Sequence, residues 1–128
     1  MFHQVKLGAE DQDSLRFLWW IGSIDEANQV YVMTVHIFGA ADSTCSANCI
    51  LLRSADDNEG SFGPVTTDTL THNVYVDHLL KSVPIPEEAI TLMEKLIELC
   101  AEGGFNLVKF VTNNRKVFFF CYNSGKES

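Results

Sequence analysis

The sequence has few positive charges. It holds 9 lysines and arginines against 17 aspartates and glutamates, a net charge of −8 over 128 residues. Phosphate contacts draw mainly on Lys and Arg, so this balance argues against a chain that grips nucleic acid unaided. If this chain acts on nucleic acid, another part of a larger assembly would have to supply the positive charge.

The sequence also lacks a long apolar run. No stretch approaches the roughly 18 residues that span a bilayer. The first thirteen residues, MFHQVKLGAEDQD, have neither the charged start nor the apolar middle of a signal peptide. Apolar residues make up 46% of the chain, which is enough for a core of ordinary density. We expect one soluble domain over residues 1–128, without a membrane partner, in the cytoplasm or alternatively in the nucleus.

Compact metal-binding motifs of cysteine and histidine are missing. The chain has four of each residue, but no CxxC or HxxxH element. Cys45 and Cys49 lie four apart in an expected helix, which leaves a zinc site open as an alternative. The commoner interpretation is small buried thiols. Cysteines in a chain without a signal peptide favour a reducing compartment.

Hydrophobic periodicity predicts an α+β fold, an antiparallel sheet with helices packed on one face. Strands are expected over 14–22, 30–39, 73–83 as two short strands around a bend, 105–111 and 117–122. Helices are expected over 44–57 and 86–101.

Three further expectations concern burial and loops. The strand over 30–39 is apolar on both faces, which indicates burial on both sides. The second helix should begin at Pro86 and bury one apolar face against the sheet. That face contains Leu92, Met93, Leu96 and Ile97. Residues 61–72 contain Gly, Pro and four Thr without periodicity, so we expect a loop there.

The stretch NVYVDHLL places an acidic residue, Asp77, at the bend between two short strands. A metal-dependent enzyme can position a ligand at such a bend. A single acidic residue at a strand end is, however, most often a solvated turn residue. Asp77 alone therefore does not indicate a metal site, and its interpretation depends on the segments around it.

Several segments occur in an order and spacing that resemble the palm of a reverse transcriptase from a BEL/Pao-type retrotransposon. They are MFHQV, RFLWW, VHIFGAADSTCSAN, NVYVDHLLKSV with EEAITLMEKLIEL, and GGFNLVKFVTNN. The resemblance covers about residues 1–118. It implies a partial palm-like domain whose fingers and thumb are missing.

The resemblance also implies site residues. The intact enzyme transfers deoxynucleotides by a two-metal mechanism, with Mg²⁺ as cofactor and an RNA or DNA template-primer as partner. Asp77 matches a catalytic carboxylate that binds metal, and Lys109 matches a lysine near the triphosphate. The matches to the nucleotide pocket are Phe2, Phe38, Gly39 and Tyr75. Taken alone, Phe2 is a core aromatic and Lys109 a solvated surface lysine.

Two departures from the family pattern predict an inactive chain. His78 stands where the family has a second aspartate, and imidazole is a poor ligand for Mg²⁺ that cannot restore the negative charge. The family's first catalytic aspartate corresponds to a position before Met1. We therefore expect this chain alone to bind no Mg²⁺ and no nucleic acid strongly. The alternative is a non-catalytic acidic α+β module that binds a protein through an exposed sheet face.

Overall fold

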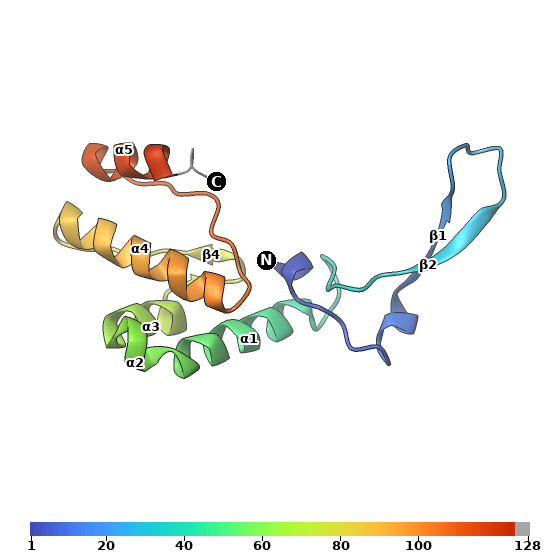
Figure 1. Cartoon of the computed structure of the whole chain (residues 1–128), viewed down its shortest axis with the longest axis horizontal. Coiled ribbons are helices and arrows are strands. Elements are labelled where there is room, and N and C mark those ends of the chain that lie inside the picture. The colour runs from blue at the N-terminus through green and yellow to red at the C-terminus, as the bar shows by residue number, and fades with distance from the viewer. Residues whose placement is uncertain (125–128) are drawn as a thin grey trace. The chain divides into compact units, whose positions relative to one another are not determined.

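The computed structural model describes residues 1–124, and the chain divides into two compact units (Figure 1). The first unit comprises residues 1–47, and the second unit begins at Asn48. The described residues form five α-helices and two small antiparallel sheets, so the α+β class is confirmed. The strands form two separate hairpins, where the sequence predicted one sheet. The prediction of a single domain stays a prediction, because the structure determines each unit by itself.

A β-hairpin dominates the first unit. Two 3₁₀ turns, Phe2–Gln4 and Gln12–Leu15, precede strand β1 (Arg16–Trp20), which pairs antiparallel with β2 (Asn28–Val32). After β2 the chain runs back along the N-terminal segment. There the N–H of His36 donates to the carbonyl of Val5 at 3.0 Å.

The strand predicted over 30–39 is wrong in its second half and in its burial. β2 ends at Val32, and residues 33–39 have irregular backbone with an isolated bridge at Val35. All five residues of β2 are exposed. Within residues 1–124, β2 pairs only with β1, so this hairpin is a two-stranded sheet and not part of a larger one. An apolar pattern on both faces of a strand indicates burial only where other layers cover that strand.

The predicted loop over 61–72 is wrong, because the segment is helical. Helix α1 (Ser43–Asp57), expected from the sequence, is followed by α2 (Glu59–Phe62) and α3 (Pro64–His72). Pro64 stands at the first turn of α3, where a missing N–H costs nothing. Four threonine hydroxyls donate to carbonyls one turn earlier, from Thr66, Thr67, Thr69 and Thr71. Thr69 and Leu70 are buried, so packing outweighs the low helix propensity of threonine.

Helix α4 (Pro86–Glu102) agrees with its predicted bounds but not with its predicted partner. Met93 and Leu96 are buried as expected, together with Leu99 and Cys100 on the same face, while Leu92 and Ile97 are half-buried. α4 packs against α3 and α5, and the described residues form no large sheet for it to cover (Figure 1). Burial raises the pKa of the Cys100 thiol from 9.0 to about 11.

The last two predicted strands, 105–111 and 117–122, are also wrong. Residues 105–114 have no regular structure, and α5 (Arg115–Ser124) follows. The side chain of Asn114 accepts the N–H of Lys116 at 2.9 Å, which is the geometry of a helix N-cap. Val117 is buried, and the sulfur of Cys121 lies 3.4 Å from that of Met93 on α4. Docking on α4 therefore overrides the β propensity of three consecutive phenylalanines.

The cysteines only partly match the buried thiols expected. Cys100 is buried, but Cys45 and Cys49 on α1 are exposed.

Candidate functional site

The predicted hairpin around Asp77 is present. β3 (Val74–Tyr75) pairs antiparallel with β4 (His78–Leu79), with Val74 opposite Leu79 and Tyr75 opposite His78. Val76 and Asp77 form the connecting turn. One further hydrogen bond, from the N–H of Leu80 to the carbonyl of Asn73 at 3.0 Å, extends the pairing. Asp77 thus lies at the tip of the hairpin, as the sequence predicted.

Val76 has a backbone conformation that β-branched residues rarely adopt. Its φ is +57°, and within residues 1–124 no other non-glycine residue has a positive φ. A two-residue turn with positive φ at its first central residue matches a type II′ hairpin turn, where glycine is usual. For valine this conformation costs of order 1–3 kcal/mol, and such strain concentrates at functional sites. The strain marks this turn as the candidate site.

Asp77 and His78 pair with each other at the tip. Nδ1 of His78 lies 2.7 Å from Oδ1 of Asp77. The side chain of His78 is 85% exposed and that of Asp77 is 40% exposed, so both meet solvent. One oxygen of the carboxylate is therefore already engaged by the residue that stands where the resembled family has a second aspartate.

A polar cluster lies at the base of the hairpin, and the sequence patterns did not predict it. Nζ of Lys81 lies 3.1 Å from Oδ1 of Asn73 and 4.0 Å from Oδ2 of Asp68. Nδ1 of His72 lies 2.9 Å from the other oxygen of Asp68. Asp68 and His72 are four apart, a spacing that would have signalled this pair had the segment been interpreted as a helix. The cluster ties the C-terminal end of α3 to the chain after β4.

The remaining predicted site residues fall into two groups. Phe2, Phe38 and Gly39 lie in the first unit, where the rings of Phe2 and Phe38 meet edge-to-face with centroids 5.0 Å apart. Phe2 is buried, which fits its interpretation as a core aromatic, and Phe38 is exposed. Tyr75, exposed on β3, and Lys109 lie in the second unit. Lys109 is an exposed residue of the irregular segment before α5, not of a strand.

The donor set at the hairpin tip does not fit a Mg²⁺ site. Mg²⁺ requires several hard oxygen ligands in near-octahedral geometry, whereas Asp77 has only an imidazole beside it. Within the described part of the chain, no group of three or more His, Cys, Asp or Glu side chains is arranged to hold a metal ion.

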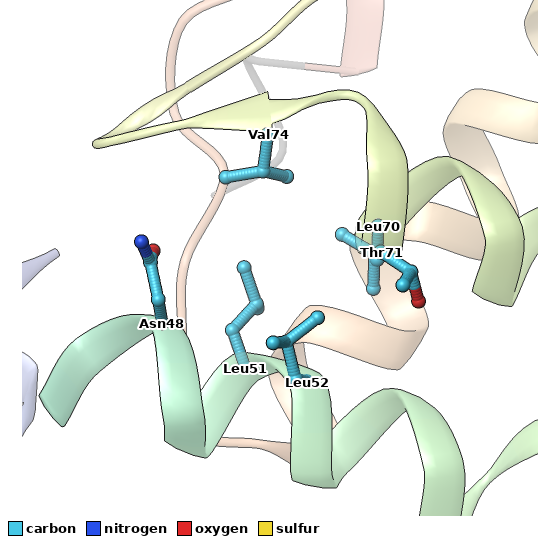
Figure 2. A pocket seen from close by; sticks show the side chains of 6 residues that line it. All are labelled: Asn48, Leu51, Leu52, Leu70, Thr71 and Val74. Carbon is cyan, nitrogen blue, oxygen red and sulfur yellow. The ribbon is translucent and has the colours of Figure 1, made fainter. Parts of the chain in front are cut away.

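A hollow of about 70 Å³ lies elsewhere in the second unit (Figure 2). Its lining comes from α1, α3 and β3, and consists of Asn48, Leu51, Leu52, Leu70, Thr71 and Val74. Oδ1 of Asn48 is buried and makes no hydrogen bond to any described residue. Sites for drug-sized ligands measure about 300 Å³ or more, so this hollow suits small polar molecules such as water and not a nucleotide.

No comparison with known proteins supports this candidate site. Comparison with protein-family models, curated proteins and solved structures finds no match for this chain. Over residues 1–124, no helix is both long enough and apolar enough to cross a membrane.

Proposed function

We propose that this chain derives from the palm of a BEL/Pao-type reverse transcriptase and does not transfer nucleotides by itself. The observation that carries the proposal is the strained two-residue turn at Val76-Asp77, which presents a carboxylate at a hairpin tip. In the resembled family this carboxylate helps to hold the catalytic metal ions. A positive φ at valine is costly, and a turn with no positional role would be better served by glycine.

The lack of catalysis follows from the neighbour of Asp77. Two-metal transfer needs converging carboxylates that balance four positive charges. His78 supplies no negative charge, and its Nδ1 lies 2.7 Å from one of the two carboxylate oxygens of Asp77. Lys109 and the aromatic residues Phe2 and Phe38 belong to this proposal only through the resemblance.

Primer extension on an RNA template tests the catalytic part. We expect no incorporation by the 128-residue chain with Mg²⁺ or Mn²⁺. Incorporation that Asp77→Asn abolishes would overturn the proposal, because it would make His78 a working residue of the site.

A graft tests the palm origin separately. The hairpin over residues 73–83 replaces its counterpart in an active enzyme of the resembled family. We expect the graft to be inactive with His78 and active once His78→Asp restores the paired carboxylates. A graft that stays inactive with His78→Asp would show that this hairpin is not a palm hairpin, provided that the grafted enzyme remains folded.

A second candidate function is a protein-interaction module, and one observation favours it. Apolar side chains cover both faces of the β1–β2 hairpin in the first unit, and most of them are exposed. A hollow of about 330 Å³ lies at the base of this hairpin, lined mainly by Leu15, Phe17, Met33 and Ile37. Contiguous apolar surface of this kind marks interaction sites.

A further inference from the structure

The hollow between α1, α3 and β3 has a buried hydrogen-bond acceptor on its wall. Oδ1 of Asn48 is buried and accepts no hydrogen bond from any described residue. Most buried polar atoms in proteins are hydrogen-bonded, and an ordered water molecule commonly satisfies those that lack a protein partner. An amide oxygen can only accept, so whatever satisfies Oδ1 must be a hydrogen-bond donor.

The opposite wall of the hollow adds backbone acceptors. Leu70 and Thr71 lie in the last turn of α3, and the last four carbonyls of an α-helix have no partner inside the helix. The carbonyl of Thr69 accepts the N–H of Asn73 at 3.0 Å, but within residues 1–124 no backbone N–H donates to the carbonyls of Leu70 and Thr71. Helix carbonyls point toward the C-terminal end, where Val74 completes the lining.

The lining selects the chemistry of the ligand. The hydroxyl of Thr71 already donates to the carbonyl of Thr67 at 2.9 Å, so its oxygen can only accept. An anion would therefore face acceptor oxygens, and a metal ion would find no carboxylate in the lining. Water donates two hydrogen bonds and fits this arrangement. The other side chains of the lining are apolar: Leu51, Leu52, Leu70 and Val74.

The volume indicates how many water molecules fit. A water molecule takes about 30 Å³ in the liquid, so a hollow of about 70 Å³ holds about two. Asn48 lies on one side of the hollow, and Leu70 and Thr71 lie on the other (Figure 2). Two water molecules in series would span the space between these walls.

We propose that two ordered water molecules bind in this hollow and bridge Asn48 of α1 to the C-terminal carbonyls of α3. The first water donates to Oδ1 of Asn48 and hydrogen-bonds to the second, which donates to a carbonyl of the last turn of α3. Each water then has two partners, the fewest that buried waters usually have. This inference holds whether or not the chain derives from a palm domain.

The bridge makes Asn48 a positioning residue for the β3–β4 hairpin. Asn73 directly follows α3, and its carbonyl accepts the N–H of Leu80 at 3.0 Å, which is the last hydrogen bond at the base of the hairpin. A water-mediated contact is nearly as strong as a direct hydrogen bond. The water pair therefore links α1 to the point where the hairpin begins.

Water-selective NOE spectra of the full chain, with labelled leucine and valine methyl groups, test the binding. We expect cross-peaks from bound water to the methyl groups of Leu51 and Val74. Asn48→Leu removes the acceptor and should abolish them, whereas Asn48→Asp keeps an acceptor and should keep them. Thr71→Val is the control for a signal relayed by the hydroxyl, and the cross-peaks should persist in it. Absence of cross-peaks in the unmodified chain, or their persistence in Asn48→Leu, would overturn the proposal.

Amide hydrogen exchange tests the positioning role. In Asn48→Leu the N–H of Leu80 should exchange at least about threefold faster, because the base of the hairpin opens locally, while the N–H of Leu99 on α4 keeps its rate. Asn106→Leu is the matched control, since Asn106 is an exposed asparagine of the same unit, and it should leave both rates unchanged. Equal exchange of Leu80 in the unmodified chain and Asn48→Leu would overturn the link from the water pair to the hairpin.

Discussion

Replacing Leu99 with alanine should remove a large part of the stability of the second unit. The side chain of Leu99 is 0% exposed, on the face of α4 that also buries Met93 and Leu96. Three carbon atoms leave the core, which costs about 2.4 kcal/mol of transfer free energy at about 0.8 kcal/mol each. A residual cavity of roughly 50–80 Å³ adds about 1–2 kcal/mol. The expected loss is therefore about 3–4 kcal/mol, out of a total of about 5–15 kcal/mol for a chain of this size.

Urea unfolding followed by far-ultraviolet circular dichroism measures this loss. The midpoint should fall by about 1–4 M at an unchanged slope, given slopes of about 1–3 kcal/mol/M. Glu98→Ala is the matched control, because Glu98 is the exposed neighbour on the same helix turn and its replacement should change stability by less than about 0.5 kcal/mol. A loss under about 1 kcal/mol for Leu99→Ala would refute the packing of α4 between α3 and α5.

Three further changes bear on the second unit. Val76→Gly should raise the free energy of unfolding by about 0.5–1 kcal/mol, because glycine relieves the strain at φ +57°; a fall in urea-measured stability would mean that the side-chain contacts of Val76 outweigh that strain. The pKa of Cys100 is about 11 in the folded chain against an ordinary 9.0. The stability that burial of the protonated thiol contributes is therefore fully present below pH 9.0 and is lost as pH rises through about 11. The loss is about 2–3 kcal/mol, and Cys100→Ala should remove this part of the pH dependence of unfolding. His78→Asp should tighten Mn²⁺ binding about tenfold through one added charge near Asp77, and Mn²⁺-induced broadening of NMR signals from residues 74–80 would report it; equal broadening in both proteins would contradict a metal-binding role for the tip.

Two helices were predictable because local signals and packing agree. The helix predicted over 86–101 has a proline and two glutamates at its start, an apolar stripe, and two glycines at its end, and α4 follows that pattern within one residue. α1 was likewise expected within one residue at its start. Each of these helices satisfies its sequence rules without help from a distant partner.

α3 and α5 were not predictable from local patterns, because tertiary contacts decide both. Threonines and phenylalanines both favour strands over helices as single residues. In α3 the threonine hydroxyls bond within the helix, and in α5 the cap at Asn114 and the burial of Val117 stabilise the helical form. The segment TNNRK lies between the strands expected over 105–111 and 117–122. In the structure the side chain of Asn114 accepts a hydrogen bond from the N–H of Lys116, and this cap begins α5.

The candidate site was predictable in position but not in its strain or pairing. Two short strands around a bend are expected over NVYVDHLL, which puts Asp77 at a hairpin tip, and the register of β3 and β4 agrees. The positive φ of Val76 depends on the pairing of Tyr75 with His78, which leaves only two residues for the turn. No single-residue propensity predicts that pairing. The Asp77–His78 contact likewise depends on the side-chain geometry of the folded turn.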